Sequence, residues 1–117
     1  MRILYIEDDP ISIRVMQRIT NYLADELLIA STVADGIIMA MNKPDLVLLD
    51  LNLPDGKGLD VARRIRELGY MFPVVALTAG NIGSDYQRCL DAGCNDYVVK
   101  PVNFPQMCAY LNKWFGR

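Results

Sequence analysis

The sequence predicts a doubly wound α/β domain, in which a five-stranded parallel sheet lies between two layers of helices. Five short apolar runs alternate with five stretches of helical period along the chain. The run from Leu46 to Leu49 is apolar at every position, which is typical of a strand buried on both faces of a parallel sheet. No linker or repeat interrupts the alternation, so we expect one domain over residues 1–117 and no output domain in this chain.

The first half of the chain is expected to supply two strands, over residues 2–6 and 27–30. A helix follows each strand, over residues 10–23 and up to about residue 42. Asp9 and Pro10 suit the N-cap and the first position of the first helix, and Ser31 or Thr32 can cap the second. The apolar stripe expected on the first helix is Ile11, Val15, Ile19, Tyr22 and Leu23.

The central strand ends at Asp50. Pro54 and Gly56 then turn the chain, and a third helix follows over residues 58–68. Gly69 ends that helix. Its inner face is expected to be Val61, Ile65 and Leu68, and its mostly solvated residues Arg63, Arg64 and Arg66.

The fourth strand is predicted over residues 73–77 and a loop over residues 79–83. Ser84 and Gln87 have the spacing of a capping box for the fourth helix, which Gly93 ends. The fifth strand is predicted over residues 96–99, and Asn103 caps the last helix. The expected apolar stripe of the last helix is Phe104, Met107, Cys108, Leu111 and Phe115.

Composition excludes several classes of protein. Twelve basic and 14 acidic residues give a net charge of −2 without a basic stripe, which argues against direct binding of nucleic acid. No apolar run has the length of a membrane span, and the N-terminus reads as a strand and not as a signal peptide. The chain has no histidine, which excludes Ser-His triads and histidine zinc sites. Its three cysteines form no CxxC pair and are expected to be reduced and mostly buried in a cytoplasmic protein.

Polar side chains follow four of the predicted strands. Glu7 and Asp8 follow the first, Asp50 the third, Thr78 the fourth and Lys100 the fifth. Because the carboxyl ends of parallel strands meet at one edge of a sheet, these residues should converge there. Each alone could equally be a turn or surface residue. Together they indicate a site for a hard cation, Mg²⁺ or alternatively Mn²⁺, because three crowded carboxylates repel one another until a cation joins them.

An ammonium and a hydroxyl beside these carboxylates suit the oxygens of a phosphoryl group. An aspartate next to a metal, a lysine and a hydroxyl can attack phosphorus and form an acyl phosphate. The sequence therefore predicts that Asp50 is a nucleophile in phosphoryl transfer, and that Lys100 and Thr78 hold the phosphoryl oxygens.

At this point the chain resembles the response-regulator receiver domains of two-component signalling, over essentially its whole length. The resemblance implies a flavodoxin-like strand order of 2-1-3-4-5. The order and spacing of four motifs carry it: Ile6-Glu7-Asp8, Leu48-Leu49-Asp50 with Leu53-Pro54-Asp55-Gly56, Ala76-Leu77-Thr78-Ala79, and Ala92-Gly93 through Asp96-Tyr97-Val98-Val99-Lys100-Pro101.

The resemblance implies a role for each site residue. Asp50 would accept a phosphoryl group from the phosphohistidine of a histidine kinase or a histidine phosphotransfer protein, so the chain would be a phosphoacceptor that promotes its own phosphorylation and dephosphorylation, and not an enzyme. Asp8, Asp50 and the backbone carbonyl of Asn52 would bind Mg²⁺ directly, and Glu7 through water. Lys100 would neutralise a phosphoryl oxygen, and the peptide bond before Pro101 would be cis.

The resemblance also implies a switch. Thr78 would move to the phosphoryl group and Tyr97 would follow it, which alters the face formed by the fourth helix, the fifth strand and the last helix. A downstream protein or an output domain would bind that face, and Tyr110, Trp114 and Met107 near the last helix are candidates for a homodimer contact. Gly80 and Gly83 should lower the cost of moving the start of the fourth helix.

Three features refine this interpretation. Asp9 is assigned to the helix cap and not to the metal. Lys57 stands where many relatives carry an acidic residue, and should alter the electrostatics toward partners. Asn52 and Gly80 occupy positions that tune the lifetime of the aspartyl phosphate, for which we expect an intermediate value.

Two alternatives remain open. A phosphatase of the haloacid dehalogenase type shares these residue types but needs a general acid two residues beyond the nucleophile, where this chain has Asn52. A receiver-like interaction module that is never phosphorylated would have the same fold.

Overall fold

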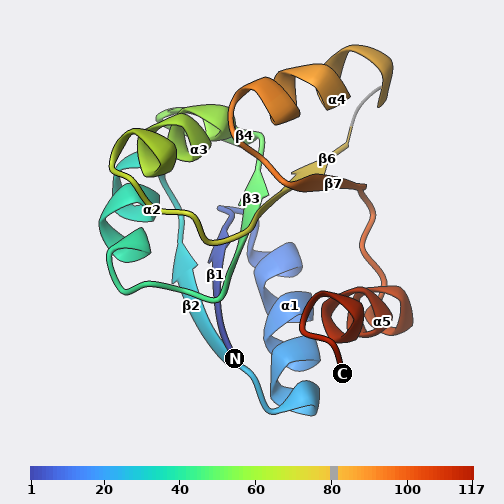
Figure 1. Cartoon of the computed structure of the whole chain (residues 1–117). Coiled ribbons are helices and arrows are strands. Elements are labelled where there is room, and N and C mark those ends of the chain that lie inside the picture. The colour runs from blue at the N-terminus through green and yellow to red at the C-terminus, as the bar shows by residue number, and fades with distance from the viewer. Residues whose placement is uncertain (80–81) are drawn as a thin grey trace.

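The computed structural model describes residues 1–79 and 82–117, and its central feature is a parallel sheet of five strands (Figure 1). The strand order is β2-β1-β3-β6-β7, and every neighbouring pair is parallel. This order confirms the predicted topology, with each strand within one residue of its expected bounds. The strands are β1 (Arg2–Ile6), β2 (Glu26–Ala30), β3 (Leu46–Asp50), β6 (Val74–Thr78) and β7 (Asp96–Val99).

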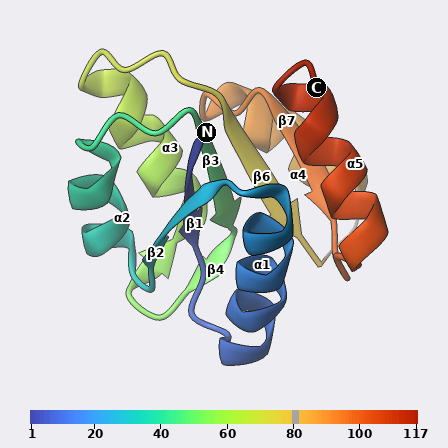
Figure 2. The same cartoon turned by 90° about the horizontal axis from the view of Figure 1, so that it is seen from below.

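Helices cover both faces of the sheet, which confirms the three predicted layers. Figure 2 shows α1 and α5 on one side of the sheet and α2 and α3 on the other. Helix α4 contributes Cys89 to the second side, and Ala92 follows directly after the helix. The helices are α1 (Pro10–Leu23), α2 (Val33–Ala40), α3 (Gly58–Glu67), α4 (Ile82–Asp91) and α5 (Phe104–Trp114). A two-stranded antiparallel hairpin, β4 (Asn52–Leu53) and β5 (Gly56–Lys57), lies between β3 and α3 and was not predicted.

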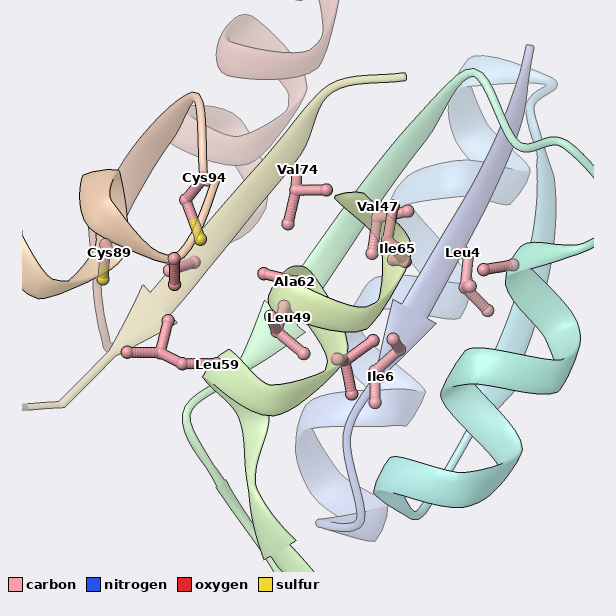
Figure 3. Close-up of a cluster of buried hydrophobic side chains, with 14 of the residues drawn as sticks. Leu4, Ile6, Val47, Leu49, Leu59, Ala62, Ile65, Val74, Cys89 and Cys94 are labelled. Carbon is pink, nitrogen blue, oxygen red and sulfur yellow. The ribbon is translucent and has the colours of Figure 1, made fainter. Parts of the chain in front are cut away.

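Alternate residues of the central strands face two separate hydrophobic clusters. Leu4, Ile6, Val47 and Leu49 pack with α2, α3 and the end of α4 (Figure 3). The residues between them, such as Tyr5 and Leu48, pack against α1 and α5. Burying one such large side chain contributes about 1.5–3 kcal/mol, so β1 and β3 are held from both faces. The resulting rigid strands fix the positions of the residues that follow them.

The predicted face of α1 is only partly right. Asp9 caps the helix as expected, because its carboxylate accepts a hydrogen bond from the Ser12 N–H at 3.1 Å. Ile19 is buried, but Ile11 and Tyr22 are 71% and 72% exposed. Met16 and Thr20 are buried in their place, and the Thr20 hydroxyl is satisfied there by the carbonyl of Met16. The helix is therefore rotated so that a hydroxyl capable of bonding back to its own helix enters the core.

The prediction that Arg66 is mostly solvated is wrong. Its guanidinium donates to the carbonyls of Tyr70, Phe72 and Gly93 and to the side-chain oxygen of Asn95, at 2.9–3.0 Å. Arg66 thus fastens the loop after α3 to the loop after α4. The partners lie up to 29 residues away, which helical periodicity around Arg66 does not reveal.

Smaller corrections concern element ends. Leu68 caps α3 and Phe104 begins α5, and both are exposed at the helix ends where the sheet no longer covers them. Thr32 caps α2, which ends earlier than predicted, at Ala40. Helix α4 begins at Ile82 and not at Ser84, so the residue expected to cap it lies inside the helix. The expectation for Gly80 falls outside the described residues.

Other expectations are confirmed. The side chains of Cys89, Cys94 and Cys108 are buried thiols, and the Lys100–Pro101 peptide bond is cis. Within the described ranges, no helix combines the length and apolar character needed to cross a bilayer.

Candidate functional site

The strand ends bring Glu7, Asp50, Thr78 and Lys100 to one edge of the sheet. The strand register aligns Ile6 with Leu49, one residue before Glu7 and Asp50. It also aligns Asp50 with Leu77 and Thr78 with Val99, so all four polar residues emerge at the same level. The convergence predicted from the sequence is therefore present.

Glu7, Asp8 and Asp50 form an acidic cluster, with one carboxylate oxygen from each lying within 4.8 Å of the others. Glu7 is 1% exposed and Asp50 8% exposed, whereas Asp8 is exposed to solvent. Oxygen-only donors of this kind match Mg²⁺, which typically takes one or two protein carboxylates and keeps several waters. The donor chemistry of the cluster therefore fits the predicted cation, which could enter from the open side at Asp8.

Lys100 joins the two buried carboxylates. Its Nζ lies 2.7 Å from Oε1 of Glu7 and 3.4 Å from Oδ1 of Asp50. Burial by itself lowers the pKa of Lys100, but the hydrogen bond to Glu7 and the charge of Asp50 outweigh this effect and raise it. Lys100 is therefore a charged ammonium that faces an oxygen of Asp50.

Glu7 has an environment that resists a full negative charge. Burial raises the pKa of Glu7, and the neighbouring Asp50 adds to the increase, while Lys100 opposes it. The Tyr5 hydroxyl, 3.3 Å from Oε1, and the N–H of Asp8, 3.2 Å from Oε2, hold the carboxylate in place. Burial and the neighbouring carboxylate thus both disfavour the charged form of Glu7.

Asp9 is absent from this cluster, as the cap assignment predicted. Hydrogen bonds from the hydroxyl and the N–H of Ser12 lower the pKa of Asp9. Its carboxylate is thereby committed to the start of α1.

Thr78 and Tyr97, the predicted switch pair, lie on neighbouring strands. Thr78 is buried at the end of β6 and borders a cavity of about 180 Å³ that Leu51 and Asn52, the two residues after Asp50, also line. Tyr97 in β7 is half-buried, and its ring centroid lies 5.0 Å from that of Tyr86 in α4. Lys57, which is exposed, lines the same cavity.

Gly58 is a site residue that the sequence did not reveal. Its N–H donates to the carbonyl of Leu51 at 2.9 Å, which closes the loop after β3. A Cβ atom at this position would overlap the backbone carbonyl oxygen of Asp50. Only glycine therefore lets the start of α3 approach Asp50 so closely. A glycine at a helix start without a positive φ gives no local signal of this constraint.

Asp55 is a second residue whose role was missed. Its carboxylate accepts hydrogen bonds from the backbone N–H groups of Val33 and Ala34, at 2.7 and 3.2 Å. These donors, that of Val33 above all, hold the pKa of Asp55 below its usual range. The turn after β3 is thereby fastened to the start of α2.

Comparison with known proteins identifies the family. The model described as "Response regulator receiver domain" matches residues 3–112. The two-component response regulator PhoP of Pseudomonas aeruginosa is 43% identical over 60 residues, which are 51% of this chain and 27% of PhoP. The osmosensing histidine protein kinase SLN1 of Saccharomyces cerevisiae is 39% identical over 49 residues, 42% of this chain and 4% of SLN1. The chain thus spans about a quarter of the first relative and far less of the second.

Solved structures agree over the whole chain. The receiver domain of a sensor histidine kinase from Pseudomonas aeruginosa PAO1, with a magnesium ion coordinated in its active site cleft, is 31% identical with a TM-score of 0.86 and covers 99% of this chain and 98% of its own. A two-component response regulator from Clostridium difficile is 25% identical with a TM-score of 0.92, covering 100% and 97%.

Fold and site together define a doubly wound α/β domain with an acidic cluster and a lysine at the carboxyl edge of its sheet. More particularly, this chain belongs to the response regulator receiver domain family of two-component systems.

The close approach at Gly58 gives a testable prediction. We expect Gly58→Ala to displace the backbone of Asp50, and to lower the free energy of unfolding by about 1–3 kcal/mol, the usual cost of overpacking. It should also weaken Mg²⁺ binding, measured by calorimetry. Gly69→Ala is the control: a Cβ there meets nothing within 4 Å, and the cost is about 1 kcal/mol for its positive φ, without a change in Mg²⁺ affinity. Equal Mg²⁺ affinity in both variants would contradict the interpretation that Gly58 fixes the position of Asp50 for the metal.

Proposed function

We propose that this domain accepts a phosphoryl group on Asp50 in a two-component or phosphorelay pathway. The observation that carries the proposal is the placement of Asp50: its carboxylate is nearly buried at the end of β3, with Lys100 on one oxygen and two further carboxylates within 4.8 Å. In the transfer, an Asp50 oxygen bonds to phosphorus as the bond from phosphorus to the donor nitrogen breaks.

Mg²⁺ fits the acidic cluster, and Mn²⁺ is the alternative cation. We assign Asp8, Asp50 and the backbone carbonyl of Asn52 as direct ligands, and Glu7 as a ligand through water. The cation, when bound, neutralises charge on the phosphoryl oxygens. Asp8 is the exposed member of the cluster, while Glu7 remains paired with Lys100.

Lys100 and Thr78 hold the remaining phosphoryl oxygens in this proposal. Lys100 already lies at an oxygen of Asp50, so it needs little rearrangement to neutralise a group attached there. Thr78 turns its hydroxyl toward the phosphoryl group, and Tyr97 moves into the space that Thr78 leaves. The change shifts an existing equilibrium of the domain.

The partners follow from this switch. A histidine kinase or a histidine phosphotransfer protein supplies the phosphoryl group, and a downstream protein or output domain reads the face of α4, β7 and α5. On that face the Tyr110 hydroxyl donates to Asp96 at 2.6 Å, and the Tyr110 ring meets Trp114 edge-on. Met107, the third residue predicted for a homodimer contact, is 1% exposed and belongs to the core, so we restrict the proposed homodimer contact to Tyr110 and Trp114. We place the domain in the cytoplasm, without direct contact to nucleic acid or membrane.

The domain is proposed to be a phosphoacceptor that promotes its own phosphorylation and dephosphorylation, and not an enzyme acting on separate substrates. A haloacid dehalogenase-type phosphatase would need a proton donor where Asn52 stands, and an amide cannot serve in that role. An interaction module without phosphorylation would have no need for the buried pairing of Lys100 with Glu7 and Asp50, which is costly to desolvate.

Phosphorylation of Asp50 is tested by intact mass spectrometry. With Mg²⁺ and acetyl phosphate, we expect one phosphoryl group per chain, and none on Asp50→Asn, because an amide is not a nucleophile toward phosphorus. Asp35→Asn, which removes an exposed carboxylate from α2, should be labelled like the native chain. Labelling that persists in Asp50→Asn, or steady turnover of unrelated phosphomonoesters, would refute the proposal.

Cation binding is tested by thermal unfolding. At ten times its dissociation constant, Mg²⁺ should stabilise the fold by about 1.4 kcal/mol, which raises Tm by about 4–6 °C for a domain of this size. Asp8→Ala should abolish the rise. Asp50→Asn should stabilise the metal-free protein, because it relieves the repulsion of Asp50 that, after burial, contributes to the raised pKa of Glu7. An Asp8→Ala variant that still gains the full increase would show that Mg²⁺ binds elsewhere.

The switch is tested with beryllofluoride, a mimic of the phosphoryl group, and NMR. Together with Mg²⁺ it should shift the amide resonances of Thr78 and Tyr97 far more than those of Ile19 in the opposite layer. Unchanged resonances at Thr78 and Tyr97, despite bound beryllofluoride, would favour the interaction module.

A further inference from the structure

The turn at Asp55 connects the loop after β3 to a helix that takes no part in the proposed chemistry. Its two carboxylate oxygens accept the N–H groups of Val33 and Ala34, in the first turn of α2. The first N–H groups of a helix have no partner within the helix, so these bonds satisfy two donors that would otherwise need water. Thr32 satisfies a third, the N–H of Asp35, at 3.0 Å. An exposed aspartate thus uses both of its oxygens in contacts across the fold.

The segment that bears Asp55 is short and internally hydrogen-bonded. Asn52 pairs with Lys57 and Leu53 with Gly56 in the β4–β5 hairpin, and Asp55 lies in the turn between the two strands. At its base, the Gly58 N–H donates to the carbonyl of Leu51 at 2.9 Å. A displacement of the turn would therefore be transmitted through one or two ladder pairs to Asn52, which is two residues beyond Asp50.

We infer that Asp55 is a positioning residue for the metal site: by fastening the hairpin to α2, it fixes the Asn52 carbonyl at the distance that the cation requires. This inference rests on the proposed function, in which that carbonyl binds Mg²⁺ directly. Mg²⁺ demands near-ideal geometry at short distances, so the tether matters more for this cation than for a more adaptable one. Through the hydrogen bonds between Asp55 and α2, binding of the cation would also stabilise the start of α2, although α2 supplies no ligand.

A simpler role for Asp55 would be to cap α2. In that case its removal would destabilise the fold but leave the cation affinity of the folded protein unchanged. Coupling between two sites is reciprocal. If Asp55 positions the metal site, bound Mg²⁺ must in turn strengthen the hydrogen bonds from the Val33 and Ala34 N–H groups to Asp55. If Asp55 only caps α2, bound Mg²⁺ should leave these hydrogen bonds unchanged.

The experiment measures the Mg²⁺ dissociation constant by calorimetry, on the full chain well below Tm. Ligand-supporting contacts of this kind typically affect metal affinity by about 10–100-fold. Because Asp55 acts through two backbone pairs, we expect the Mg²⁺ dissociation constant of Asp55→Ala to be roughly tenfold larger than that of the native chain. Asp55→Asn keeps one acceptor for the Val33 N–H and should recover part of the loss. Asp35→Asn removes another exposed carboxylate from the same helix turn and should bind as the native chain does.

Hydrogen exchange supplies the second readout. In the native chain, Mg²⁺ should slow the exchange of the Val33 and Ala34 amides, and in Asp55→Ala it should not. Unchanged affinity in both Asp55 variants, or Mg²⁺ protection of these amides that survives in Asp55→Ala, would overturn the inference while leaving the proposed function intact. A native chain that fails to bind Mg²⁺ would overturn both. Should Asp55→Ala not fold, Asp55→Asn carries the comparison alone.

Discussion

The structure depends on how it accommodates opposite charges at one edge of a rigid sheet. Glu7 and Asp50 are almost fully buried there, and the ammonium of Lys100 lies within 3.4 Å of both. Burying a charge without a partner costs several kcal/mol, so this arrangement requires compensation. One ammonium cannot offset three carboxylates. Burial, and then the neighbouring Asp50, raise the pKa of Glu7 despite the opposing effect of Lys100. That excess negative charge suits the binding of a divalent cation, which in the proposed function would offset it.

Much of this site could be predicted because it is built from strand ends. An apolar run of four or five residues marks a buried strand locally, and the parallel topology then determines which residues meet. Glu7, Asp50, Thr78 and Lys100 need no further information, and the structure brings them together. The same reasoning failed for Arg66, Gly58 and Asp55. Their roles depend on close packing, or on partners 21 to 29 residues away, that no local period or propensity encodes.

Helix faces were predicted less well than strands, and α1 shows why. Helical period gives the width of an apolar stripe, but the rotation of the helix is set by what packs against it. In α1 the sheet and α5 cover Met16, Ile19 and Thr20, and leave Ile11 and Tyr22 outside. Thr20 is tolerated inside because its hydroxyl bonds to the Met16 carbonyl. The start of α4 was misplaced for a related reason: a capping-box spacing at Ser84 does not prevent the helix from beginning at Ile82.

The donor set also indicates why a magnesium-like ion suits this edge better than calcium. Calcium takes six to eight oxygens, usually from a flexible loop that wraps around it. Here three carboxylates form the cluster, and two of them follow buried strands directly or end one. The proposed fourth ligand, the carbonyl of Asn52, belongs to the hairpin that Asp55 fastens to α2. Magnesium accepts such a partial set because it keeps waters in its remaining positions. In the proposed function, phosphoryl oxygens would replace some of those waters, so an incomplete set of protein ligands would let the cation and the phosphoryl group bind together.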